Sequence, residues 1–154
     1  LSYIDEKGKK QKPMVIHRAV YGSFERFIGI LLEHFGGALP LWLSPIQAEV
    51  INVGAGQRKY AQKIYLELKR AEIRVAMSDD NLTVGKKIRE AEVTKIPYIL
   101  VVGEKEETAG TVNVRRRSSA ADAKAMASQG KDNTEMKIEK LISKIKEEIE
   151  SKKL

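Results

Sequence analysis

The spacing of hydrophobic positions changes repeatedly along this chain. Short apolar runs typical of buried strands alternate with segments in which apolar residues recur at the spacing of one helix face. Such alternation predicts a sheet whose parallel strands are joined by covering helices. The strand-like runs are 47–53, 73–77, 98–102 and 111–116, and the helix-like segments are 57–71 and 84–94.

The C-terminal third departs from simple alternation. The segment 103–110 is too short for a parallel crossover, so we expect a turn that leads into an antiparallel strand at 111–116. Residues 118–133 have no apolar period and are expected to be mobile. From residue 134 onward, apolar residues at helical spacing predict a long amphipathic helix that closes the domain. These residues are Met136, Leu141, Ile145 and Ile149.

The first part of the chain has fewer elements. A short polar hairpin with its turn at 5–10 is expected to precede a strand at 14–16. Gly22 permits a tight turn, Ser23 suits a helix N-cap, and apolar residues at helical spacing predict a helix over 24–35. These elements cannot close a hydrophobic core alone.

Paired glycines and a proline follow this helix and should end it, because neither residue type sustains a helix. We therefore place the end of one domain at this point. Residues 1–37 are expected to be its remnant, 38–45 an extended apolar linker, and 46–154 a complete domain. Trp42 in the linker should pack against one of the two flanking units. The predicted fold class is α/β, with a mixed and mainly parallel sheet of about five strands covered by helices.

The composition limits the kind of partner. The 154 residues include 28 Lys and Arg against 21 Asp and Glu, and the net charge of +7 favours a polyanionic partner. The absence of cysteine excludes disulfides and thiolate metal sites and fits a reducing compartment. No apolar run is long enough to cross a bilayer, and the chain starts at Leu1 without a signal peptide. We expect a cytoplasmic fragment of a larger protein, with no membrane or DNA partner.

Two residues of the first part are candidates for ligand binding. Arg26 lies in the first turn of the expected helix, where backbone N–H groups and a guanidinium can hold a phosphate together. A solvated surface arginine is the alternative. His17 could ligate zinc, but a catalytic zinc needs three protein ligands and His34 is the only other histidine.

The second part of the chain contains a larger group of basic residues. Asn81 lies just before the expected basic helix, and Glu106 lies in the turn before the basic strand. Amide, carboxylate and guanidinium groups can recognise base edges, whereas lysines mainly hold phosphates. Asn113, Arg115 and Arg117 alternate along one strand and should share a face. The mixture suits an unstacked RNA loop, and a solvated face that protects a sheet edge is the alternative. The basic residues are Lys86, Lys87, Arg89, Lys95, Arg115, Arg116 and Arg117.

Several stretches closely resemble class II aminoacyl-tRNA synthetases, and among them the threonyl-tRNA synthetase family. Residues 17–19 (HRA) followed by 22–31 (GSFERFIGIL) resemble motif 3 of that family. Three later stretches resemble its C-terminal anticodon-binding domain, and less closely that of the histidyl, glycyl and prolyl enzymes. They are 81–90 (NLTVGKKIRE), 96–106 (IPYILVVGEKE) and 112–115 (VNVR).

The resemblance implies roles for three residues of the first part. His17 would be one of three zinc ligands, the other two lying earlier in the catalytic domain, and the zinc would hold the amino and hydroxyl groups of threonine. Ser23 would lie beside that substrate, and Arg26 would contact ATP in catalysis. Because motifs 1 and 2 are missing from this chain, we expect it to be inactive alone and to bind ATP and zinc stably only within the full-length enzyme.

The resemblance also implies roles in RNA binding and a set of partners. The full-length enzyme would activate threonine with ATP, transfer it to the terminal ribose of its tRNA, and act as a homodimer. The residues placed at the anticodon bases are Asn81, Arg89, Glu106 and Arg115. Further RNA contacts are expected from Lys86, Lys87, Lys95 and Arg117.

Three alternatives remain open at this point. Another class II synthetase of the same subgroup, prolyl, histidyl or glycyl, could carry a similar domain, although the prolyl and histidyl enzymes do not use the zinc histidine. A freestanding RNA-binding module could reuse the anticodon fold without catalysis, but it would have no reason to keep a motif 3 strand and helix. A basic structural protein without an RNA role is the third.

Overall fold

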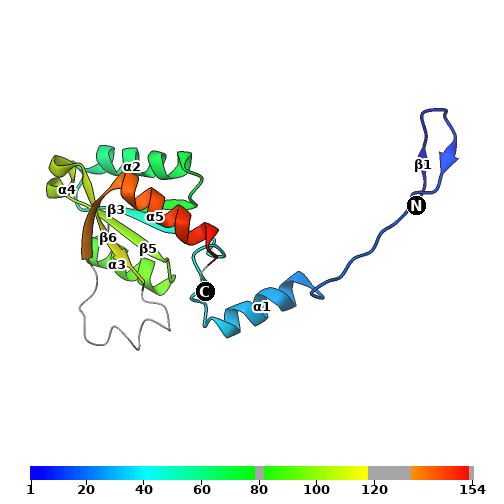
Figure 1. The fold of residues 1–154 in the computed structure, drawn as a ribbon, viewed down its shortest axis with the longest axis horizontal. Helices are drawn as coiled ribbons and strands as arrows, with labels where there is room; N and C mark the ends of the chain where they lie inside the picture. Colours follow the sequence, from blue (N-terminus) through cyan, green and yellow to red (C-terminus); the bar gives the residue numbers. More distant parts are fainter. Residues whose placement is uncertain (79–81, 118–132, 153–154) are drawn as a thin grey trace.

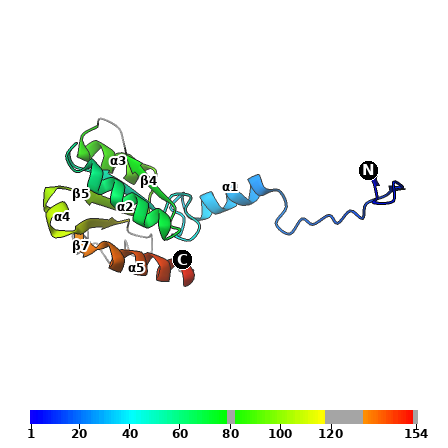
Figure 2. The same ribbon diagram turned by 90° about the horizontal axis from the view of Figure 1, so that it is seen from above.

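The computed structural model describes residues 1–78, 82–117 and 133–152. Residues 38–78, 82–117 and 133–152 form a body around a sheet, and an N-terminal arm extends away from it in both views (Figures 1 and 2). In the described part of the chain no helix has the length and apolar character needed to span a membrane.

A five-stranded mixed sheet forms the centre of the body, in the order β4-β3-β5-β6-β7. The first three of these strands are mutually parallel, whereas β6 is antiparallel to both of its neighbours. Thus β7 again points the same way as β5, and the expected mixed sheet with mainly one strand direction is confirmed. The strands are β3 (Ala48–Asn52), β4 (Val75–Ser78), β5 (Tyr98–Val102), β6 (Thr111–Arg116) and β7 (Asn133–Lys137).

Helices cover both faces of this sheet. Helix α2 (Arg58–Arg70) and helix α5 (Ile138–Glu150) bury Ile64 and Leu141 in the larger hydrophobic cluster. Helix α3 (Val84–Val93) contributes Ala91 to a smaller cluster on the opposite face. This layering follows from the alternation of strand residues, because neighbours along one strand point to opposite faces.

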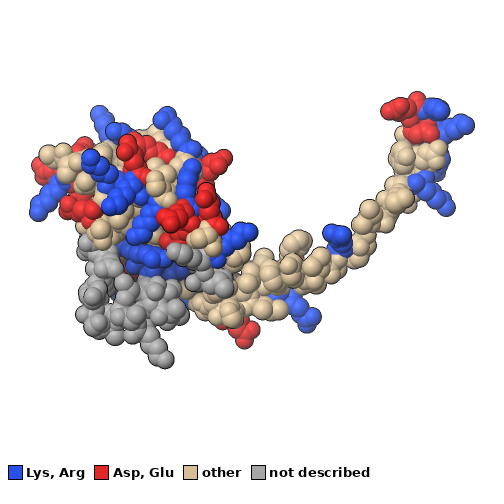
Figure 3. All heavy atoms as spheres, in the orientation of Figure 1, with Lys and Arg blue, Asp and Glu red and all other residues tan. Residues whose placement is uncertain are grey.

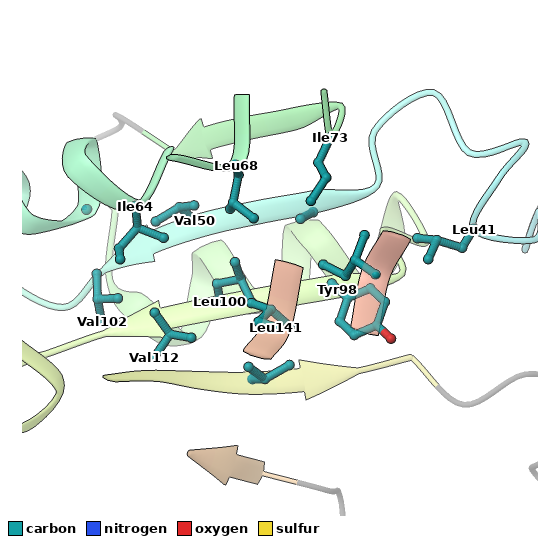
Figure 4. Close-up of a cluster of buried hydrophobic side chains, with 14 residues drawn as sticks. Leu41, Val50, Ile64, Leu68, Ile73, Tyr98, Leu100, Val102, Val112 and Leu141 are labelled. Atoms are coloured by element: carbon teal, nitrogen blue, oxygen red, sulfur yellow. The ribbon is translucent and has the colours of Figure 1, made fainter. Parts of the chain in front are cut away.

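The larger cluster extends from the middle of the sheet to the linker. Leu100 and Val112 lie at its centre and are fully buried, and Leu41 from the linker joins it at the end where Tyr98 lies (Figure 4). Residues 41–43 form a turn in which the N–H of Leu43 donates to the carbonyl of Pro40 (3.0 Å). The expectation of an extended linker here is wrong, because burial of Leu41 requires the chain to fold back onto the body.

Two further elements of the body differ from the sequence-based expectation. Residues 103–110 contain the short helix α4 (Glu104–Ala109) and not only a turn. The C-terminal helix does not begin at residue 134, because 133–137 first pair with β6 as a fifth strand. Met136 lies opposite Val112 and packs against the larger cluster. Its position also fits the spacing of the following helix, but it belongs to β7. Of the segment 118–133, expected to be mobile, Asn133 instead belongs to β7, and 118–132 lie outside the described residues.

The arm contains a short hairpin and one helix. Strands β1 (Tyr3–Ile4) and β2 (Lys10–Gln11) pair as the expected hairpin, and α1 (Phe24–His34) is the expected helix. Residues 14–16, expected to be a strand, make no strand pairing and expose Met14 at 90%. A strand needs a partner for its backbone groups, and the described chain provides none at this place. Much of the arm is neither acidic nor basic (Figure 3).

Candidate nucleic-acid interface

Arg115 of β6 lies on the sheet face that α3 covers. Its neighbours Val112 and Val114 are buried in the larger cluster on the other face, so Asn113 and Arg115 point to the α3 side. A guanidinium nitrogen of Arg115 lies 3.5 Å from a carboxylate oxygen of Glu92 on α3. The structure therefore brings the last basic strand and the basic helix together, although they are distant in sequence.

Helix α3 adds exposed basic side chains to this face. Lys86 and Arg89 are both exposed. Arg89 stands three residues before Glu92, at the spacing that places two side chains on the same side of a helix. The helix begins at Val84, soon after Asn81, a predicted base contact that lies outside the described residues. Lys86 and Arg89 are thus available to an RNA chain that reaches Arg115.

Lys87 is not part of the exposed face that the sequence predicted. Its side chain is only 5% exposed, and its Nζ donates to Oδ1 of Asn52 and to the carbonyl of Ser78, both at 3.4 Å. Helical spacing explains the difference, because Lys87 and the buried Ala91 are four residues apart and both face the sheet. That spacing is visible in the sequence and would have separated Lys87 from Lys86.

A half-buried carboxyl lies under α3 on the same face of the sheet. Glu49 of β3 occupies the row of the sheet that continues through Ile99 to Arg115. Burial raises the pKa of Glu49 above its usual range, and the charge of Glu90 adds to the rise, while Lys87 opposes it. The buried amine of Lys87 thus compensates part of the cost of a carboxylate in this position.

Glu106 lies at the other end of the strand pair from Arg115. Its carboxylate accepts a hydrogen bond from the N–H of Gly103 (2.9 Å), which satisfies a free backbone donor at the start of α4. Arg115 pairs with Ile99 near the start of β5, whereas Glu106 follows the end of that strand. Four residues of strand correspond to roughly 13 Å. The two side chains therefore could meet different nucleotides of one loop.

Arg117 and Lys95 do not stand on the α3 face as free cations. The guanidinium of Arg117 donates to the carbonyl of Leu39 (2.6 Å) and to that of Lys95. Burial lowers the pKa of Arg117, and the charge of Arg116 contributes in the same direction. The Nζ of Lys95 donates to the carbonyl of Gly36. The expectation that Arg117 shares an RNA-binding face with Arg115 therefore conflicts with its contacts to the linker.

Arg116 points to the opposite face and meets α5. One of its guanidinium nitrogens lies 2.7 Å from Oε1 of Glu148, and the hydroxyl of Tyr98 donates to Oε2 of the same carboxylate (2.8 Å). Burial raises the pKa of Tyr98, and its hydrogen bond to Glu148 raises it further. No sequence pattern identifies Tyr98 and Glu148 as partners, because nothing in their spacing connects them.

The predicted catalytic residues of the arm are all exposed. Ser23 is the N-cap of α1, and its Oγ accepts from the backbone N–H of Arg26 (3.3 Å), as the sequence predicted. The side chains of His17 and Arg26 are likewise exposed to solvent. Within 1–78, 82–117 and 133–152, no three His, Cys, Asp or Glu side chains gather as metal ligands. The described residues thus do not fit a complete zinc site by themselves.

Comparison with known proteins identifies the body. Residues 47–148 match the family model of the anticodon binding domain. The threonine–tRNA ligase of Carboxydothermus hydrogenoformans is 54% identical over 117 residues, which cover 76% of this chain and 18% of that protein. The threonine–tRNA ligase of Caldanaerobacter subterraneus subsp. tengcongensis is 42% identical over all 154 residues, and 22% of its length is covered. The chain thus spans about a fifth of the length of these relatives.

A solved structure agrees with these matches. The RNA binding domain of threonyl-tRNA synthetase from Cryptosporidium parvum Iowa II superposes with a TM-score of 0.71 at 33% identity. The superposition covers 96% of this chain and 34% of the other. The chain therefore belongs to the anticodon-binding domain family, in the form of that domain found in threonyl-tRNA synthetases.

Proposed function

We propose that this chain recognises the anticodon of threonine tRNA as the C-terminal part of a threonine–tRNA ligase. The observation that carries this proposal is the position of Arg115 on the α3 face of a sheet that matches the anticodon binding domain. A guanidinium offers fixed paired donors, which suit the acceptor edge of a base. Its salt bridge to Glu92 is partly exposed and of little energy, so a base can replace the carboxylate.

The remaining contacts divide by chemistry. Arg89, Glu106 and Asn81 would recognise bases together with Arg115, since their amide, carboxylate and guanidinium groups have directional donors and acceptors. Lys86, exposed on α3, would hold phosphates. An anticodon loop has unstacked bases, which is the form of RNA that side chains recognise by sequence. Recognition by several spaced side chains fits the separation between Arg115 and Glu106.

The arm would belong to the catalytic domain of the complete enzyme. There His17 would ligate zinc, Ser23 would lie beside threonine, and Arg26 would contact ATP. When bound, the zinc would hold the substrate's amino and hydroxyl groups. The complete enzyme would form a homodimer in the cytoplasm. The match of one ligase over all 154 residues supports including the arm in this proposal.

The proposal is tested by binding of tRNA transcripts that differ only in the anticodon. Arg115→Ala should weaken the cognate transcript by roughly 1–3 kcal/mol and leave anticodon-altered transcripts nearly unaffected. Arg70→Ala, at the exposed end of α2, is the matched control and should change neither affinity. An equal loss for all anticodons would make Arg115 a phosphate contact. Failure of the unaltered chain to distinguish anticodons would refute the proposed function.

The catalytic role of the arm needs a separate measurement. This chain alone should not catalyse threonine-dependent exchange of pyrophosphate into ATP, because it lacks motifs 1 and 2. In the complete enzyme, His17→Ala should lower zinc content and threonine activation together. Zinc content equal to that of the unaltered enzyme would show that His17 is not a ligand.

A further inference from the structure

Side chains of the body hold the linker by its backbone carbonyls. Arg117, at the end of β6, donates to the carbonyl of Leu39 at 2.6 Å and to that of Lys95. Lys95, in the turn after α3, donates in turn to the carbonyl of Gly36. Arg117 thus contacts the linker directly and also binds the backbone of Lys95, the other residue that contacts the linker. We call these two side chains the linker clamp.

The following part of the linker is held in the same way. Arg74 donates from Nε to the carbonyl of Ser44 and from its terminal nitrogen to that of Trp42, both at 2.9 Å. The side-chain amide of Gln47 donates to the carbonyl of Leu41 (3.0 Å). Side chains of the body therefore bind backbone carbonyls at intervals along the linker, from Gly36 to Ser44, shortly before β3 begins.

The linker clamp is energetically costly to form. The Nε of Arg117 is buried without a hydrogen-bond partner, and its guanidinium is half-buried. Lys95 has a φ of 59° and directly follows the C-cap of α3, a position at which helices often end in the left-handed conformation. Desolvation of this kind persists only where surrounding contacts compensate for it.

The clamp acts at the exit of α1. Helix α1 ends at His34, and Gly36 and Gly37 follow with φ of 55° and 77°. The N–H of Gly37 still donates to the carbonyl of Leu32 in the last turns of the helix (2.8 Å). A cation bound at the carbonyl of Gly36 therefore holds the end of α1 itself and restricts the rotation that two glycines would otherwise allow.

We propose that Arg117 and Lys95 are positioning residues that fix the direction of α1 relative to the anticodon-binding body. The inference rests on the proposed function in one respect. Helix α1 carries Arg26, the proposed ATP contact, so the direction of α1 would set the position of that contact relative to the body that binds the anticodon. Arg115, the proposed base contact, lies in β6, and Arg117 directly follows the end of that strand. The two arginines thus have different partners, RNA for one and the linker for the other.

The test measures the direction of α1 and RNA affinity on the same variants. The chain has no cysteine, so Glu33→Cys on α1 and Gln62→Cys on α2 give two defined spin-label sites at exposed positions. The distance distribution between the labels should have one narrow peak in the parent and broaden in Arg117→Ala. Arg70→Ala, an exposed arginine outside the clamp, is the matched control and should leave the peak narrow. Affinity for an anticodon stem-loop should stay within about twofold in both variants.

The outcomes separate the clamp from its alternatives. A peak that stays narrow in Arg117→Ala overturns the proposal. A loss of stem-loop affinity of about tenfold with a narrow peak would instead make Arg117 an RNA contact, and this too overturns it. If Arg117→Ala does not fold, Arg117→Lys and Lys95→Gln each remove part of the clamp and should broaden the peak. If the parent chain binds no anticodon stem-loop, the proposed function fails, and the label distances still decide on the clamp.

Discussion

Lys86 and Lys87 are adjacent lysines for which the structure predicts opposite consequences of substitution. Lys86 is exposed on α3, whereas Lys87 is 5% exposed and donates to Asn52 and Ser78. We expect Lys86→Met to weaken RNA binding and its salt dependence, and Lys87→Met to leave both nearly unchanged. Methionine keeps most of the apolar stem of lysine and removes only the charged group, so each variant is the matched control of the other.

The magnitudes follow from the contacts. One phosphate contact to a single strand contributes about 0.7 to the negative slope of log affinity against log salt concentration. Its loss should therefore make the gain in affinity on tenfold dilution of salt about fivefold smaller. Lys87→Met removes two hydrogen bonds of 3.4 Å, which lie at the weak end of about 0.5–1.5 kcal/mol each. It also removes the cation that opposes the raised pKa of Glu49, so the half-buried carboxylate loses that compensation. The free energy of unfolding should fall by about 1–3 kcal/mol at neutral pH.

The assay is fluorescence anisotropy of a labelled anticodon stem-loop, titrated with each variant at several salt concentrations. Urea unfolding of the same samples checks that both variants are folded. If Lys87→Met flattens the salt dependence as much as Lys86→Met does, Lys87 contacts a phosphate, and the reasoning from its burial is refuted. Equal slopes for Lys86→Met and the parent chain would remove Lys86 from the RNA contacts.

Three further substitutions test other parts of the structure by urea unfolding. Glu49→Gln should raise stability at neutral pH, because burial and then Glu90 raise the pKa of Glu49, so the folded chain binds the proton more tightly. The gain should grow as pH rises through the folded pKa and vanish below the usual glutamate pKa; a gain independent of pH would contradict this. Tyr98→Phe removes the 2.8 Å hydrogen bond to Glu148 and should cost about 1.5–3 kcal/mol, and no loss would mean that the bond has no net value. Leu141→Ala, at a fully buried site, should cost about 2–5 kcal/mol, and a smaller loss would show that the site collapses around the cavity.

The sequence by itself predicted most elements of the body. Helix α2 and strands β3 and β5 were identified at nearly their observed bounds, because their apolar spacing reflects which side of each element faces the core. Elements without a distinctive local period were missed. Helix α4 has only six residues, and the strand β7 contains apolar residues that also fit the period of the helix after it.

The candidate interface was predicted as a set of residue types, but not as an arrangement. Arg115, Arg116 and Arg117 are chemically identical and consecutive, yet they contact Glu92 of α3, Glu148 of α5 and the linker. Alternation along the strand correctly separates Arg115 from Arg116. It also groups Arg117 with Arg115, and this grouping does not hold where the strand ends and the chain approaches the linker.

Local sequence and tertiary structure therefore determine different properties of this protein. Apolar period, glycines and N-cap residues act on a few neighbouring positions, so the sequence specifies strands, helices and the chemistry available for RNA. The partner of a charged side chain depends on segments that meet only in the fold. Arg117 contacts a carbonyl 78 residues earlier, and Lys87 an amide 35 residues earlier. Which cations remain free for RNA is decided by these contacts, because only the folded chain brings the acceptors within hydrogen-bonding distance.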